Sequence, residues 1–158
     1  MEIIYIHDIS TDENIKYLDA IMNITREVFG KENDSIGIRC SHILLQEVHK
    51  KDAKKVFLVQ EENRIIGFLL FSTLIEFTGY IHWMAIEENH RNKRLGTMLL
   101  DKIEAKAKIE NISNILLITQ DTGFYEKSGY EKVKETYRNK IICDIERSEW
   151  LMIKNTYN

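Results

Sequence analysis

Hydrophobic positions change their period near residue 95, and the rest of the chain is organised around this change. Residues 80–86 are rich in aromatic and β-branched side chains and are bounded by Gly79 and a polar run at 87–89, which predicts a buried strand. From Leu95 the apolar residues recur at helical spacing while Asp101 and other polar residues face away, which predicts an amphipathic helix. Its apolar face should comprise Leu95, Met98, Leu99, Ile103 and Ala107. A tight turn must join the strand to the helix.

The N-terminal part of the chain predicts one strand followed by two helices. Residues 2–7 favour a strand, and Ser10 and Glu13 have the spacing of a capping box, so a helix should begin there and end at Gly30. A polar loop at residues 31–35 then precedes a second helix at about residues 38–51.

Further apolar runs predict the strands of a single sheet. Residues 56–60 and 65–73 flank a polar connection and should form a hairpin, whose continuous apolar run at 65–71 indicates a central strand buried on both faces. A strand at 114–119, a short helix at 122–128 ended by Gly129, and a closing pair of strands at 131–138 and 150–154 follow. This order favours one domain over residues 1–158, with a mixed sheet and helices on both faces.

Composition excludes several classes of function. The chain has 158 residues with 44% apolar residues, enough for one domain with a core. Its formal net charge of −3 gives no electrostatic case for general nucleic-acid binding. No apolar run approaches a membrane span and the N-terminus does not resemble a signal peptide, so we expect a cytoplasmic protein without membrane contact.

The cysteines and helical histidines do not predict a metal site. Cys40 and Cys143 lie far apart in sequence, which indicates neither a zinc site nor a disulfide framework. His42 and His49 are seven residues apart on one predicted helix, whereas chelation on a helix generally needs a spacing of about three or four. We therefore expect ordinary thiols and surface or acceptor-lining histidines.

The predicted turn is cationic and lies where a helix begins. A helix N-terminus presents backbone N–H groups without intrahelical partners at the positive end of its dipole, and such a site binds phosphate. Three cationic side chains add Coulombic attraction, and Gly96 would let the backbone or a ligand approach closely. The same pattern also fits a solvated, basic helix start. The residues expected to hold a phosphate are Arg91, Asn92, Lys93, Arg94, Leu95, Gly96 and Thr97.

A second stretch, T-G-F-Y-E-K-S-G-Y at residues 122–130, follows the strand predicted at 114–119. Together the strand with its R-x-x-x-x-G turn and the F-Y-x-K-x-G-Y run resemble the acetyl-coenzyme A site of the GNAT N-acetyltransferase superfamily, over roughly residues 56–154. The resemblance implies an α/β (α+β) fold with a mixed, mostly antiparallel sheet of about seven strands flanked by about four helices. The family turn is usually R/Q-x-x-G-x-G/A, and Arg94 stands at its first glycine, so the effect of this residue on coenzyme binding stays open.

The resemblance also implies roles for individual residues, with acetyl-coenzyme A as co-substrate and no metal. Tyr125 matches the family position of the general acid that protonates the departing thiolate, although it would also pack beside the neighbouring aromatic rings. The pantetheine amides could pair with the exposed backbone of Met84, Ala85 and Ile86, as an added strand would. One N–H of this strand could stabilise the acetyl oxygen as the tetrahedral intermediate forms.

Transfer to an amine also requires a base, because an amine with the lysine reference pKa of about 10.4 is protonated at about pH 7. Tyr80, His82 and Met84 should share one face of the strand, and histidine titrates near neutral pH without special tuning. Glu76, just before the strand, is the other candidate base. A hydrogen-bonded structural histidine, with water relays moving the proton, is the alternative.

The sequence therefore predicts an N-acetyltransferase that transfers the acetyl group of acetyl-coenzyme A to a primary amine. The acceptor is a small molecule, a peptide or a protein, and its specificity should reside in residues 12–51 and 139–148. The alternative is a non-catalytic module that binds or senses acetyl-coenzyme A. The chain is expected to act as a monomer or a homodimer.

Overall fold

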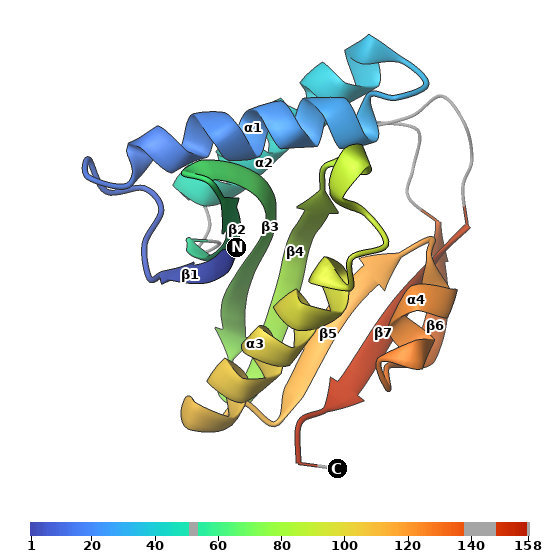
Figure 1. Cartoon of the computed structure of the whole chain (residues 1–158). Coiled ribbons are helices and arrows are strands. Elements are labelled where there is room, and N and C mark those ends of the chain that lie inside the picture. The colour runs from blue at the N-terminus through green and yellow to red at the C-terminus, as the bar shows by residue number, and fades with distance from the viewer. Residues whose placement is uncertain (51–53, 138–147, 158) are drawn as a thin grey trace.

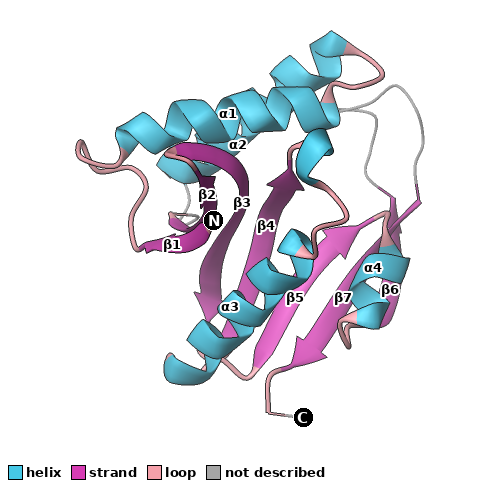
Figure 2. Cartoon of the chain, in the orientation of Figure 1, coloured by secondary structure: helices cyan, strands magenta, loops and turns pink. Residues whose placement is uncertain are grey.

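The computed structural model describes residues 1–50, 54–137 and 148–157, and its centre is a seven-stranded sheet in the order β1-β2-β3-β4-β5-β7-β6 (Figures 1 and 2). Neighbouring strands are antiparallel except β4 and β5, which are parallel. The mixed, mostly antiparallel α+β fold is confirmed. The strands are β1 (Glu2–Ile6), β2 (Lys55–Glu61), β3 (Arg64–Ile75), β4 (Thr78–Ile86), β5 (Asn114–Thr119), β6 (Glu131–Tyr137) and β7 (Ser148–Asn155). The helices are α1 (Ile15–Phe29), α2 (Asp34–Lys50), α3 (Leu95–Ile109) and α4 (Thr122–Lys127), with a short 3-10 turn η1 (Glu88–His90).

Two hydrophobic clusters lie on the two faces of the sheet. One lies beneath α1 and α2, and the other lies beneath α3 and α4. Strand β3 contributes to both, because Phe68 and Leu70 enter the first cluster while Leu69 and Phe71 enter the second. The predicted central position of this strand is therefore confirmed. None of the helices in the described ranges is long and apolar enough to cross a membrane.

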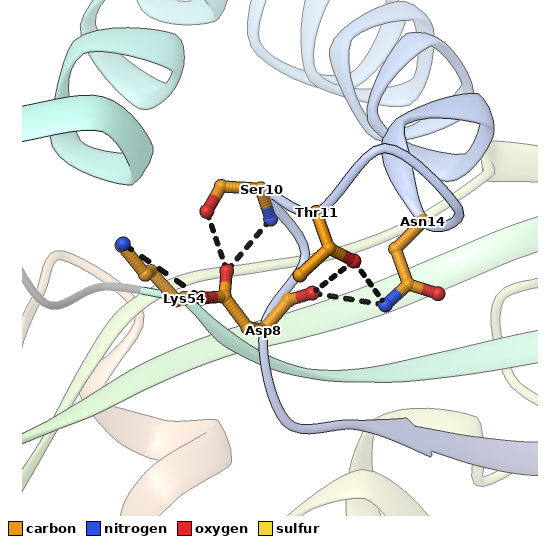
Figure 3. A network of polar contacts seen from close by, with 5 residues as sticks. All are labelled: Asp8, Ser10, Thr11, Asn14 and Lys54. Atoms are coloured by element: carbon orange, nitrogen blue, oxygen red, sulfur yellow. Dashed lines mark hydrogen bonds and ion pairs between the residues drawn. The ribbon is translucent and has the colours of Figure 1, made fainter.

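The predicted capping box at Ser10 and Glu13 is wrong. Helix α1 begins at residue 15, and Asn14 precedes it without a side-chain capping bond. The Asp8 carboxylate instead accepts hydrogen bonds from the N–H and hydroxyl groups of Ser10, at 2.9 and 2.5 Å (Figure 3). These bonds lower the pKa of Asp8. The Asn14 amide donates to the Asp8 carbonyl at 2.9 Å. Ser10 and Asn14 thus both stabilise the loop around Asp8, and the helix begins after this loop.

Helix α1 ends at Gly30 as predicted, but α2 begins at Asp34, earlier than expected. The cause is a close crossing of the two helices. A Cβ on Gly37 would lie 2.4 Å from the Arg26 carbonyl oxygen of α1 and 2.8 Å from the Gly30 Cα. Two glycines thus allow the backbones to touch, and α2 extends back to this contact.

Candidate functional site

Strands β4 and β5 pair only at their starting ends. Their register runs from Thr78↔Asn114 to Tyr80↔Leu116, after which β5 continues beside β7 and β4 beside β3. The far ends of the two strands diverge in Figure 1, and α3 begins close to them. Along residues 84–86, the backbone groups that point away from β3 have no strand partner within the described ranges. Such an edge can pair with an extended ligand that carries amide groups.

The cationic turn lies between the end of β4 and the start of α3. Residues 91–94 are exposed, and the Arg91 guanidinium donates to the Ile86 carbonyl at 3.3 Å. The Met98 N–H donates the first hydrogen bond of the helix, to the Arg94 carbonyl at 3.0 Å. The N–H groups just before Met98 belong to the first turn of α3, where the helix itself supplies no acceptor. The turn thus combines N–H donors that lack a helical acceptor with positive side chains.

Arg94 occupies a backbone conformation that explains the glycine usual at this position in the resembling family. Its φ is 58°, in the left-handed region where a Cβ carries a steric cost of about 1–2 kcal/mol. The neighbouring Asn92 also has a positive φ of 65°. The chain therefore adopts the tight turn despite the arginine, and the Arg94 side chain projects from an exposed position.

The structure places an aromatic ring of the protein close to Gly96. A Cβ on Gly96 would lie 2.9 Å from Cζ of Phe124, at the start of α4. The glycine therefore accommodates an aromatic ring of the protein. This contact seats α4 against the first turn of α3.

Tyr125 is buried on α4 beside the start of α3. Its ring packs edge-on against Phe124 at 5.0 Å and Tyr130 at 5.7 Å between centroids. Burial, with a smaller contribution from the Asp121 carboxylate, raises the pKa of Tyr125 above its usual value. The phenol thus keeps its proton at neutral pH. The Asp121 carboxylate also caps α4 by accepting the Phe124 N–H at 3.2 Å.

His82 lies in a β-bulge of β4. Leu70 of β3 pairs with Trp83, but the next residue, Phe71, pairs with Ile81, so His82 is the extra residue. A bulge leaves its extra residue out of the ladder and redirects its side chain. Bulges of this kind are over-represented beside active sites.

Two side chains from other elements contact His82. Its Nε2 lies 2.8 Å from the Ser72 hydroxyl of β3, and its Nδ1 lies 3.7 Å from the Glu47 carboxylate of α2. The same carboxylate accepts the Trp83 indole N–H at 2.5 Å. The sequence pattern did not indicate Glu47 and Ser72 as site residues, although an acidic residue between the apolar Leu44 and Val48, both buried in the structure, was a detectable signal.

The bulge also corrects the expected face of β4. The rings of Tyr80 and His82 meet edge-on at 4.8 Å, so these two side chains lie together. Met84 instead packs against the cluster beneath α3. The register shift breaks the simple alternation of side chains that the prediction assumed.

Glu76 is not brought to this region. It is exposed in the turn between β3 and β4, and the adjacent Phe77 carbonyl accepts N–H groups of Ser113 and Asn114 at the start of β5. This is the paired end of β4, whereas the cationic turn follows its other end.

An ionic cluster anchors the segment that leads into the turn. The buried Glu87 pairs with Arg64 at 2.5 Å, and His90 lies 3.1 Å from Glu61. The Glu87 N–H donates to the Ile66 carbonyl at 2.9 Å. These contacts fix the β4 end of the turn against the β2–β3 hairpin.

Within the described ranges, no group of histidine, cysteine or acidic side chains has the arrangement of a metal site. His42 and His49 are exposed on α2, and Cys40 is a buried free thiol. Cys143 and residues 139–147 of the segment predicted to set acceptor specificity lie outside the described residues.

Comparisons with known proteins agree with this architecture. An uncharacterized N-acetyltransferase of Chlorobaculum tepidum is 26% identical over 81 residues, which are 51% of this chain and 52% of the relative, so the chain matches about half of that protein's length. An aminoglycoside 6′-acetyltransferase type Ii has a TM-score of 0.75 at 19% identity, with 99% of this chain and 97% of the other covered. The PaiA N-acetyltransferase of Thermoplasma acidophilum, in complex with coenzyme A, has a TM-score of 0.70 at 18% identity, with 98% and 99% covered.

A family model described as the acetyltransferase (GNAT) family matches residues 18–130. The matched range includes β4, the cationic turn, α3 and α4 with Tyr125. This chain therefore belongs to the GNAT acetyltransferase family.

Proposed function

We propose that this chain is an N-acetyltransferase that transfers the acetyl group of acetyl-coenzyme A to a primary amine. The observation that carries the proposal is the unpaired edge of β4 next to the cationic turn that precedes α3. Family membership and the coenzyme A bound to a structural relative support it.

The coenzyme has two matching surfaces. Its diphosphate fits the N–H groups and positive side chains of residues 91–97, and its pantetheine amides fit the unpaired edge of residues 84–86. Arg91 already donates to the Ile86 carbonyl, so the pantetheine would pair with the remaining groups of that edge. The coenzyme would supply the thioester that carries the acetyl group.

Proton transfer is divided between two residues in this proposal. Tyr125 is protonated at neutral pH, as any phenol with a pKa at or above about 10 is, so it can act as the acid that protonates the leaving thiolate. His82 acts as the base, in preference to Glu76, because the bulge aims it away from the ladder while Glu76 lies at the paired end of β4. The base must offset about 4 to 5 kcal/mol, the cost of deprotonating an alkyl amine near pH 7.

The proposal is tested by acetyl-coenzyme A-dependent release of free thiol. The purified chain is incubated with acetyl-coenzyme A and a panel of small amines, an aminoglycoside, a peptide with a free N-terminus and a lysine-containing peptide. Mass spectrometry of the product must show one added acetyl group on the amine. Thiol release that does not depend on any acceptor, or no acetylated product, would count against the proposal.

The second candidate function is a module that binds acetyl-coenzyme A without catalysis. The left-handed Arg94 favours it, because a side chain replaces the usual glycine in the phosphate-binding turn. Titration calorimetry separates the two functions. Tight binding of acetyl-coenzyme A without turnover on any amine would support the module.

A further inference from the structure

Glu47 places a carboxylate on the apolar side of α2. It lies between Leu44 and Val48, which are both fully buried, and its own side chain is 21% exposed. Partial burial of a carboxylate is costly unless it has partners. The Trp83 indole N–H is one partner, but a neutral glutamine oxygen would accept that bond equally well. The contact in which the negative charge matters is with a ring that can become charged.

The Glu47 carboxylate lies beside the imidazole of His82. Glu47 is the charged group that the described structure sets against this ring, while β3 and β4 contribute the Ser72 hydroxyl and the Tyr80 ring. The 3.7 Å between Nδ1 and the carboxylate is an ion-pair distance and exceeds a hydrogen bond. A proton on Nδ1 is attracted to the carboxylate, whereas a lone pair there is repelled.

This electrostatic preference favours the neutral tautomer with its proton on Nδ1 and its lone pair on Nε2. The Ser72 hydroxyl, 2.8 Å away, then donates its hydrogen bond to Nε2. The Glu47 carboxylate of α2 thus contacts one side of the imidazole, and the Ser72 hydroxyl of β3 contacts the other. The imidazole itself lies at the bulge of β4.

We propose that Glu47 is a positioning residue that keeps Nε2 of His82 basic and stabilises the imidazolium formed during acetyl transfer. The inference rests on the proposed function. An N–H bond of the acceptor ammonium breaks and its proton passes to the Ser72 oxygen, while the original hydroxyl proton of Ser72 passes to Nε2. The acceptor nitrogen keeps its electron pair for attack on the thioester. The positive charge moves to the ring beside Glu47.

The first test compares Glu47→Gln with Glu27→Gln. In Glu47→Gln the new amide oxygen can still accept the Trp83 N–H, and Glu27 is an exposed residue of α1, so the control makes the same change in net charge. We expect kcat of Glu47→Gln to fall by about 10- to 100-fold, a part of the full effect of a general base. The KM for acetyl-coenzyme A should stay within about twofold of its original value.

Glu27→Gln should retain the original kcat. A Glu47→Gln protein with unchanged kcat per folded molecule would overturn the proposal.

The second test does not depend on turnover. The imidazole nitrogens are followed by NMR, and the His82 signals are identified by their loss in His82→Asn. We expect the Nδ1-protonated tautomer in the original protein and a larger share of the Nε2-protonated tautomer in Glu47→Gln. An Nε2-protonated ring in the original protein, or no change in the variant, would overturn the role of Glu47. Absence of acetyl transfer to every amine would instead contradict the proposed function, while the tautomer still decides whether Glu47 orients the ring.

Discussion

The Tyr125→Phe substitution tests the proposed acid with little other change to the protein. The phenylalanine keeps the ring contacts with Phe124 and Tyr130 at 5.0 and 5.7 Å. It deletes the one proton that the side chain can donate. No residue in the described ranges receives a hydrogen bond from this hydroxyl, so its removal leaves no partner unsatisfied.

The expected loss is large in rate and small in stability. General acid catalysis contributes about 100- to 10,000-fold, so the chemical step should slow by that factor, or about 2.7 to 5.4 kcal/mol in activation free energy. The free energy of unfolding should stay about the same, because the hydroxyl that is removed has no hydrogen-bond partner in the described structure. Affinity for coenzyme A should change little, since the ring is preserved.

The assay is single-turnover acetyl transfer below about pH 8.5, the reference pKa of a thiol, where release of a thiolate benefits from an acid. Tyr130→Phe is the matched control, because the Tyr130 hydroxyl is buried without a hydrogen-bond partner in the described structure. It should leave the rate unchanged and stabilise the fold by about 1 kcal/mol. If Tyr125→Phe transfers the acetyl group as fast as the original protein does, Tyr125 is not the acid and solvent takes that role.

Two further predictions concern stability. Gly37→Ala should lower the free energy of unfolding by about 2 to 3 kcal/mol, because the new Cβ would meet backbone atoms of α1. Gly123→Ala is the control: the space around Gly123 is open, so this substitution should be neutral or stabilising by up to about 1 kcal/mol. Urea unfolding measures both, and equal effects would contradict the close helix crossing. Burial raises the pKa of Tyr125 and Tyr130, so the unfolded state loses these protons first as pH rises. Stability should therefore be fully present below about pH 10 and fall above it by about 1.4 kcal/mol per pH unit for each tyrosine. Urea unfolding at about pH 9 and about pH 11 checks this, and an unchanged free energy would mean that the native protein accommodates tyrosinate.

Local sequence patterns predicted most of the helices and strands of the fold. The apolar run of β3 predicted a strand buried on both faces, and the helical period from Leu95 predicted α3 at its observed start. These patterns are informative because burial on one element repeats with that element's own period. Capping was less predictable, since Ser10 had an alternative partner in Asp8 that the capping-box spacing alone did not reveal.

The sequence by itself determined the order of elements, the cationic turn and the chemical character of Tyr125 and His82. Tertiary structure decided which residues meet. Glu47 and Ser72 reach His82 only because helix packing and a one-residue bulge bring α2, β3 and β4 together, and Glu76 stays remote because it lies at the paired end of β4. A bulge adds one residue without altering the hydrophobic composition of the strand. Contacts between elements that are distant in sequence depend on the register of the strands, and local periodicity does not predict this register.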